Sequence, residues 1–354
     1  MTLIKVKARG SEAGGRRNLI INGSMQVAQR PGGDTPTTSS GYYVDMFTVN
    51  PANLDNLTFT QAQVADAPAG TGLKKSLKFT VTAAETAVAS DEFIRIYHAV
   101  EGKNVQRFEW GTSSAKEVTL SFYVKSSITG TFACSIYIFD ANVIMNKPYT
   151  INSANTWERK TVTFPAYTAG GSAVPTDDQT AGIYINFGLL AGSSYNTQIN
   201  DWTAYGSGAN LLGGQTANVG AVNGTTWQLT GVQLEVGSAA TDFEQLTFAE
   251  ELQLCQRYYT QITHNANDVI RGGYGLTAEY WQVQLPVQMR AAPSSSLKSG
   301  TVAYSNCSSF LYYTNANNTT NNTVTAFVDP NDNTYFYLYP TSAADLVWQF
   351  IAEM

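Results

Sequence analysis

The stretch VTLSFYVKSSITGTFACSIYIF, residues 118–139, decides the fold class predicted for this chain of 354 residues. Apolar and polar residues alternate over 118–124, as they do in a strand that buries one face. The turn sequence SSITG (126–130) follows, and a second apolar stretch occupies 131–139. We therefore predict two strands joined as a hairpin, in a protein built from β-structure.

Similar strand-length patterns recur over residues 18–245, separated by turn clusters and with no amphipathic helix between them. Further strands are predicted at 57–60, 75–81, 93–98, 157–164, 183–187 and 226–236. Many short strands at such spacing favour a β-sandwich. The polar loops 166–179 and 188–223 exceed the usual connection length, so we expect them to be either functional or mobile.

The pattern changes at Leu246, where apolar residues begin to recur at helical spacing. Thr247 and Glu250 form a capping-box sequence, so a connecting helix is predicted over 246–262. Residues 263–354 return to β character, and their strands are predicted at 279–287, 309–313, 323–328, 334–339 and 346–352. The last of these segments could instead form a helix.

These patterns divide the chain into an N-terminal arm (1–17), a β-sandwich (18–245), one short connecting helix (246–262) and a second, smaller β-sandwich domain (263–354). The predicted fold class is all-β, and the chain is long enough to bury two cores. Two polar segments of the second domain, TNANNTTNN (314–322) and DPNDN (329–333), are predicted to be a loop and a turn.

Composition excludes several classes of function. Charged residues make up only 14% of the chain, the net charge is −6, and no basic run is interleaved with aromatic residues, so we expect no binding to nucleic acid. No apolar run approaches the ~18 residues that cross a bilayer, and the first residues lack a signal-peptide pattern, so we expect neither membrane insertion nor secretion by a cleaved signal. Cys134, Cys255 and Cys307 have no disulfide or metal-site spacing and are predicted to be small buried residues.

Catalytic residues are scarce. His98 and His264 have no nucleophile or metal-ligand partner at a useful spacing, so each is predicted to be a structural histidine. No phosphate-binding, zinc-binding or nucleophile motif is present, and we predict a non-enzymatic protein without a cofactor or metal ion. Glycoside hydrolysis stays open, because its two carboxylates can come from distant strands. The carboxylates available for it are Asp91, Glu92, Glu109, Asp140, Glu235 and Glu244.

The aromatic residues could let the protein bind sugars without catalysing a reaction on them. Their rings can stack on the faces of pyranoses while amide and carboxylate groups bond to hydroxyls. Tyr195, Trp202 and Tyr205 are the predicted ligand-binding residues, because they lie in a polar loop with no obvious apolar surface to cover them. Packing beneath that loop is the alternative explanation for all of them.

Four sequence blocks resemble a family of phage tail-fibre and related virion proteins that is common in marine phages. The blocks are NLIINGSMQVAQR (18–30), TWQLTGVQLEVGSAATDFE (226–244), EELQLCQRYY (250–259) and LPVQMRAAPS (285–294). They occur in the family's order and bracket nearly the whole chain. The family often has His and Pro near 245–247, where this sequence has Gln, Leu and Thr.

The resemblance implies a jelly-roll domain similar to carbohydrate-binding modules, opened by the first block and closed by the second. It also implies a virion protein in a tail-fibre-type appendage, typically a homotrimer, that contacts other tail proteins and the polysaccharide of the host surface. A purely architectural tail or capsid protein and a polysaccharide depolymerase are the alternative functions.

Overall fold

The computed structural model describes residues 16–30, 33–37, 39–170, 174–206 and 210–264, and separate stretches between 270 and 354. Those stretches are 270–274, 279–280, 286–291, 294–299, 302–305, 310–313, 321–324, 335–340 and 346–354. Most of the predicted arm, most of the Asn-rich loop and all of the turn at 329–333 lie outside the described residues.

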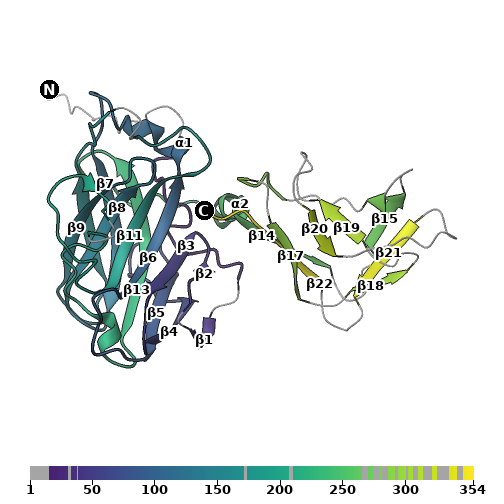
Figure 1. The fold of residues 1–354 in the computed structure, drawn as a ribbon, viewed down its shortest axis with the longest axis horizontal. Coiled ribbons are helices and arrows are strands. Elements are labelled where there is room, and N and C mark those ends of the chain that lie inside the picture. Colours follow the sequence, from purple (N-terminus) through teal and green to yellow (C-terminus); the bar gives the residue numbers. More distant parts are fainter. Residues whose placement is uncertain are drawn as a thin grey trace, which may run out of the picture.

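Two antiparallel sheets pack face to face as a jelly-roll β-sandwich (Figure 1). The six-stranded sheet contains, in spatial order, β1 (Gly33–Thr37), β4 (Thr58–Val64), β5 (Ser76–Ala83), β13 (Thr226–Val236), β7 (Val118–Ser126) and β10 (Glu158–Phe164). The seven-stranded sheet contains β12 (Thr203–Ala204), β9 (Val143–Ile151), β8 (Gly130–Ile138), β11 (Ala181–Ala191), β6 (Phe93–Glu101), β3 (Phe47–Ala52) and β2 (Gly41–Val44). The short helices α1 (Gly102–Val105), η1 (Gln106–Phe108) and η2 (Val219–Ala221) lie in the connections.

The predicted hairpin of β7 and β8 is wrong. β7 pairs with β10 and β13, whereas β8 pairs with β9 and β11, so the turn between them carries the chain from one sheet to the other. Both strands bury their apolar faces in the same core, where Phe122 of β7 packs edge-to-face on Tyr149 and Phe187 of the opposite sheet. Strands that face each other across a core show the same alternation as strands that pair at their edges, so the pattern could not separate the two arrangements.

The first described segment, 16–30, runs along the sandwich and is tied to β13. The Asn18 side chain accepts hydrogen bonds from the backbone N–H groups of Ile20 and Leu234 and donates one to the carbonyl oxygen of Val232. Ile20 and Met25 of this segment are buried in the main core. The opening and closing blocks of the sandwich are therefore in direct contact.

The connecting helix is shorter than predicted. α2 spans Phe248–Gln256, and its capping box is present: the Thr247 hydroxyl accepts from the Glu250 N–H, and the Glu250 carboxylate accepts from the Thr247 N–H. The residues predicted as its last turns instead form strand β14 (Tyr259–His264), which pairs with β22 (Leu346–Ile351). β-branched residues after Tyr259 lower the helix propensity, and pairing with β22 satisfies the backbone as a strand.

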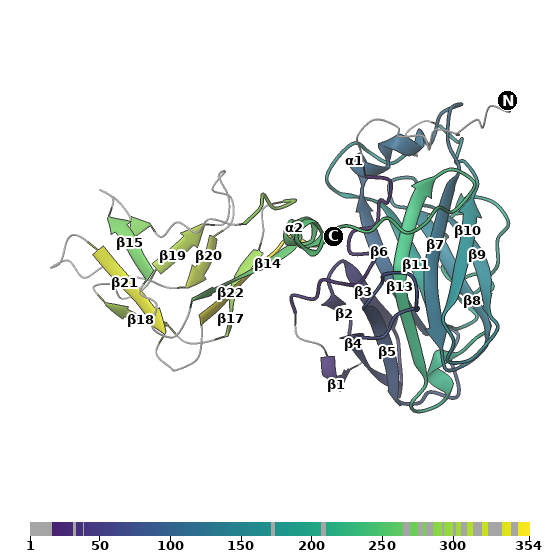
Figure 2. The same ribbon diagram turned by 180° about the vertical axis from the view of Figure 1, so that it is seen from behind.

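The second, smaller β domain is present in the C-terminal region. β14, β22 and β17 (Ser294–Ser299) form one sheet, and β15 (Ile270–Tyr274), β16 (Glu279–Tyr280), β18 (Val302–Ser305) and β21 (Tyr335–Pro340) form another, beside the pair β19 (Phe310–Tyr313) and β20 (Asn321–Val324). The terminal segment is thus a strand and not a helix. Both views place these strands in a lobe next to the sandwich, with α2 between them (Figures 1 and 2).

Charged side chains fasten this lobe to the sandwich where the chain leaves and returns. The Glu101 carboxylate, at the end of β6, accepts a hydrogen bond of 2.6 Å from the Tyr258 hydroxyl and pairs with Arg257 at 3.0 Å. Arg30 of the first segment pairs with Glu353 at 2.5 Å. Residues far apart in the sequence therefore connect the lobe to the sandwich, and we call this contact region the junction.

Candidate functional site

The outer face of the seven-stranded sheet carries a cluster of tyrosines. Alternate residues of β6, β8 and β11 point inward as isoleucines, so the residues between them point away from the core. Tyr97, Tyr137 and Tyr184 occupy such positions, and Tyr184 stands directly opposite Tyr137 in the register. Together with Tyr205 they form what we call the tyrosine face; all four side chains are half-buried.

The rings of the tyrosine face contact one another. The Tyr137 ring lies nearly parallel to the Tyr184 ring, with centroids 6.1 Å apart and planes at 22°. Tyr205 is tilted against Tyr137 at 4.6 Å, and Tyr97 meets Tyr184 edge-on at 5.5 Å. Phe139, which is 48% exposed, extends the cluster at 5.9 Å from Tyr184. The rings therefore form a continuous aromatic surface that stays partly exposed to solvent.

Polar side chains stand beside these rings. The Arg95 guanidinium donates to the amide oxygens of Asn50 at 3.0 Å and Asn186 at 2.8 Å, and lies over the Tyr97 ring at 4.8 Å from its centroid. The Asn186 amide in turn donates to the Ser135 hydroxyl. Aromatic and hydrogen-bonding groups are thus held together by rigid strands.

The loop between β11 and η2 positions Tyr205. The Asn146 side chain on β9 donates to the Asn210 carbonyl and accepts from the Ile199 N–H, which pins the loop against the sheet. The Tyr205 N–H donates to the Asn142 carbonyl at 2.8 Å. Leu211 and Leu212 are buried beneath the loop. The loop covers the β8–β9 side of the sheet and places Tyr205 beside Tyr137.

Burial raises the pKa of each of Tyr137, Tyr184 and Tyr205, because the charged phenolate is desolvated there. The phenols therefore stay protonated at neutral pH and can donate hydrogen bonds. The Tyr137 hydroxyl already donates to the Asn142 side chain at 3.0 Å.

The structure separates the residues predicted to bind a ligand. Tyr205 joins the tyrosine face, and Tyr195 lies next to it, edge-on to Phe93 at 4.7 Å. Trp202 belongs to a different cluster: it packs on Trp110 at 5.2 Å and on Tyr167 at 5.6 Å, and its indole N–H donates to the Pro165 carbonyl. Trp202 thus covers an end of the main core.

Sequence reasoning did not select Tyr97, Arg95, Tyr137 or Tyr184 as ligand-binding residues. A signal for all of them existed, because each alternates with inward-facing isoleucines: Ile94 and Ile96 flank Arg95, and Ile136 precedes Tyr137. Alternation identifies the outward residues of a strand, but it does not show which strands are neighbours.

The carboxylates considered for glycoside hydrolysis all have structural partners. Glu92 accepts from backbone N–H groups of Asp55 and Ala89, and the buried Glu235 accepts from Thr241. The remaining partners are Asn53 for Asp91, Lys116 for Glu109, Thr176 for Asp140, and the Asn18 N–H for Glu244. Asp140 follows β8 and Glu235 lies on β13, in different sheets.

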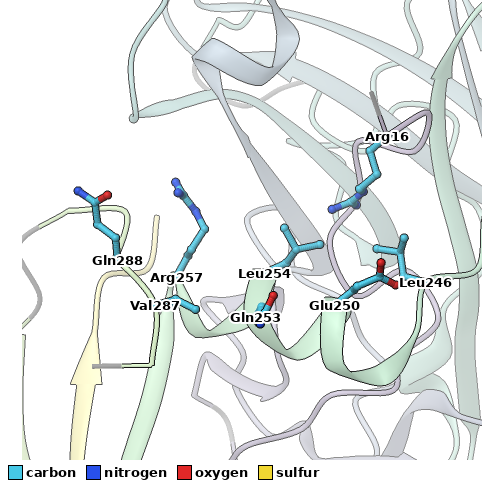
Figure 3. A pocket seen from close by; sticks show the side chains of 8 residues that line it. All are labelled: Arg16, Leu246, Glu250, Gln253, Leu254, Arg257, Val287 and Gln288. Atoms are coloured by element: carbon cyan, nitrogen blue, oxygen red, sulfur yellow. The ribbon is translucent and has the colours of Figure 1, made fainter. Parts of the chain in front are cut away.

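A pocket of about 470 Å³ lies beside α2 (Figure 3). Its charged groups are already engaged: Arg16 donates to the Asn18 carbonyl, Arg257 pairs with Glu101, and Glu250 caps α2. Leu246 and Leu254 supply much of the apolar wall. The pocket is therefore part of the junction.

The described histidine and cysteines for which we predicted structural roles, His98, Cys134 and Cys255, are all buried. His98 is buried, its Nε2 lies 3.1 Å from the Ile21 carbonyl oxygen, and burial lowers its pKa to about 3. Cys134 and Cys255 are free and buried, while Cys307 and the His264 side chain lie outside the described residues.

Within the described ranges, no group of three or more His, Cys, Asp or Glu residues could hold a metal ion. No helix there has the length and apolarity needed to cross a membrane.

No protein-family model matches the chain, and no curated protein matches its sequence. Similar solved structures include the enzymatically active domain of tailspike protein 4 of bacteriophage CBA120 (14% identity, 62% of this chain and 21% of that chain, TM-score 0.34). They also include the family 11 carbohydrate-binding module of a Clostridium thermocellum cellulase (11%, 58% and 97%, TM-score 0.29). A third is a xylan-binding domain from Paenibacillus barcinonensis (11%, 60% and 99%, TM-score 0.26). These similarities are too low to assign a function to the chain.

The fold and the site define the chain as a jelly-roll β-sandwich protein with an aromatic and polar outer face.

Proposed function

We propose that the chain is a non-enzymatic subunit of a bacteriophage virion, in a tail-fibre-type appendage, and that it binds host surface glycans on the tyrosine face. The observation that carries the binding role is the near-parallel pair Tyr137 and Tyr184, whose half-buried rings and phenols lie on the outer face of the sheet. Pyranose rings offer apolar faces that stack on such aromatic rings, and their hydroxyls bond to amides and phenols.

Alanine substitutions of the paired rings test the binding role. Tyr137→Ala and Tyr184→Ala should each lower the affinity for a bound glycan about fivefold, because each removes a stacking surface worth roughly 1 kcal/mol. The measurement is a glycan array followed by calorimetric titration of the strongest ligand. Tyr123→Ala on β7 removes a ring from the other sheet and is the matched control. A blank array, or an equal loss in the control, would contradict the proposal.

The virion role is supported by the resemblance of four sequence blocks to phage tail-fibre proteins. A homotrimer would display three tyrosine faces and raise the avidity for a repetitive glycan without any new contact. Immunogold labelling of phage particles that carry the chain should mark the tail appendages, and sedimentation equilibrium should give three times the chain mass. Label confined to the capsid or to the tail tube would favour a purely architectural protein.

Depolymerase activity is the function that the site supports least, because all six candidate carboxylates are engaged in structural hydrogen bonds or ion pairs. Incubation with host polysaccharide should release no reducing ends and cause no loss of viscosity. Either change, abolished by Asp140→Asn or Glu235→Gln, would restore the enzymatic alternative.

A further inference from the structure

Arg95 lies on the outer face of the seven-stranded sheet, beside the tyrosine face, and the partners that the structure describes for it are neutral. Its hydrogen bonds reach the amide oxygens of Asn50 and Asn186, and its guanidinium lies over the rings of Tyr97 and Phe93. Within the described part of the chain it forms no ion pair.

Several other partly buried cations have a carboxylate partner, whereas Arg16 and Arg290 donate to backbone carbonyls. Arg30 pairs with Glu353, Arg257 pairs with Glu101, and Lys125 pairs with Asp66. Each of those pairs ties two parts of the fold together. Arg95 reaches from β6 to its two neighbours in the same sheet. β3, which carries Asn50, and β11, which carries Asn186, already pair with β6 through the backbone, so the charge of Arg95 is not needed for that contact.

The position of Arg95 makes an unpaired charge costly. Burial lowers the pKa of its guanidinium, because the surrounding rings displace the water that would solvate the charge. A guanidinium has five N–H donors, of which the two amide oxygens use two. The remaining donors form a fork that matches a carboxylate, and such charge-assisted bonds are stronger than bonds to neutral oxygens.

We propose that the tyrosine face selects acidic polysaccharides, with the carboxylate of a uronic acid residue pairing with Arg95 while a neighbouring sugar stacks on Tyr137 or Tyr184. This inference rests on the proposed glycan binding and adds the chemical class of the ligand. The net charge of the chain is −6, so a preference for an anionic polymer needs a local cation and does not follow from overall attraction.

The test compares acidic polysaccharides with the same polymers after reduction of their carboxyl groups to alcohols. Polygalacturonate, alginate and hyaluronan are the probes, and binding to the immobilised full chain is measured by interferometry. At least one acidic form should bind about tenfold or more tightly than its reduced form, because the reduced sugar offers the guanidinium no charged partner. The difference should shrink as salt is added.

Two variants assign the preference to Arg95. In Arg95→Met the ratio of acidic to reduced affinity should fall to near one. In Arg159→Met the net charge changes equally, but the lost cation lies on β10 of the other sheet, so the ratio should stay at the wild-type value. Near-ultraviolet circular dichroism checks that the Arg95 variant keeps its aromatic packing.

The outcomes separate this inference from the function on which it rests. Equal binding of acidic and reduced polymers, or a ratio that survives in Arg95→Met, overturns the selection of acidic sugars and leaves glycan binding standing. Binding to no polysaccharide of either kind, together with a blank glycan array, overturns both.

Discussion

Asn22 is a buried residue that shapes the first segment of the sandwich. Its backbone is left-handed, with φ at 58°, and its side chain is fully buried. The amide nitrogen donates to the carbonyls of Val27 and Asp45, the amide oxygen accepts from the Val27 N–H, and the backbone N–H donates to Glu251 of α2. Asparagine suits the position because it tolerates this conformation and supplies both a donor and an acceptor.

Asn22→Ala should lower the free energy of unfolding by about 2–4 kcal/mol, because it leaves buried backbone groups without partners. Urea denaturation followed by tryptophan fluorescence measures the change. Asn155→Ala is the control: Asn155 has nearly the same φ, 56°, but an exposed side chain. An equal loss in both variants would mean that backbone strain, and not the buried hydrogen bonds, sets the cost.

Residues of the proposed site could be selected from the sequence only where their surroundings are local. Tyr205 is selected because a ring in a polar loop is conspicuous, and Trp202 is selected for the same reason although it packs on Trp110. The Arg95–Asn186 contact joins residues 91 positions apart and depends on the pairing of β6 with β11. A single sequence does not show which strands pair, so this contact could not be predicted from it.

At the scale of elements, strands with clean alternation were predictable and interrupted strands were not. β13 spans Thr226–Val236, the range expected from its pattern. β9 was missed, because Asn146, Lys147 and Pro148 in its middle are depleted in strands. The Asn146 side chain holds the loop that carries Tyr205, which explains why a polar residue lies there.

The close approach of the first segment to β13 depends on Gly23. A methyl group at Gly23 would lie 2.2 Å from the Val232 carbonyl oxygen, which is backbone and cannot turn aside. Gly23→Ala should therefore lower the midpoint of urea unfolding, with a cost of about 1–3 kcal/mol from overpacking. Gly206→Ala, where a methyl group meets nothing within 4 Å, should leave the midpoint unchanged. A wild-type midpoint in Gly23→Ala would show that the segment can shift away from β13.

At the scale of the whole molecule, the order of a large sandwich, one short helix and a smaller β domain was predictable from changes in periodicity. The junction could not be predicted in this way, because it brings together the first segment, the end of β6, the residues after α2 and the last residues of the chain. Tyr42 donates to the Met354 carbonyl, and Arg290 donates to the carbonyls of Ala352 and Glu353. The Tyr42 contact spans 312 residues of sequence, and the two Arg290 contacts span 62 and 63.

The junction should make stability depend on pH through Glu353. Burial raises the pKa of this carboxyl to about 7, despite the opposing effect of Arg30. An unfolded glutamate titrates near 4.3, so between these values the folded chain binds more protons than the unfolded chain. The stabilisation from protonated Glu353 is therefore complete below the unfolded pKa and is lost as the pH rises through 7.

Glu353→Gln keeps the neutral form at every pH and should remove this dependence. Relative to wild type, the variant should gain about 2 kcal/mol of stability between pH 5 and pH 8, with little difference near pH 4. Urea unfolding at several pH values measures the gain. Glu109→Gln removes a half-exposed carboxylate, paired with Lys116, away from the junction and serves as the control. Parallel pH curves for wild type and Glu353→Gln would show that the Glu353 carboxyl is ionised in the folded chain throughout this range, and that Arg30 outweighs its burial.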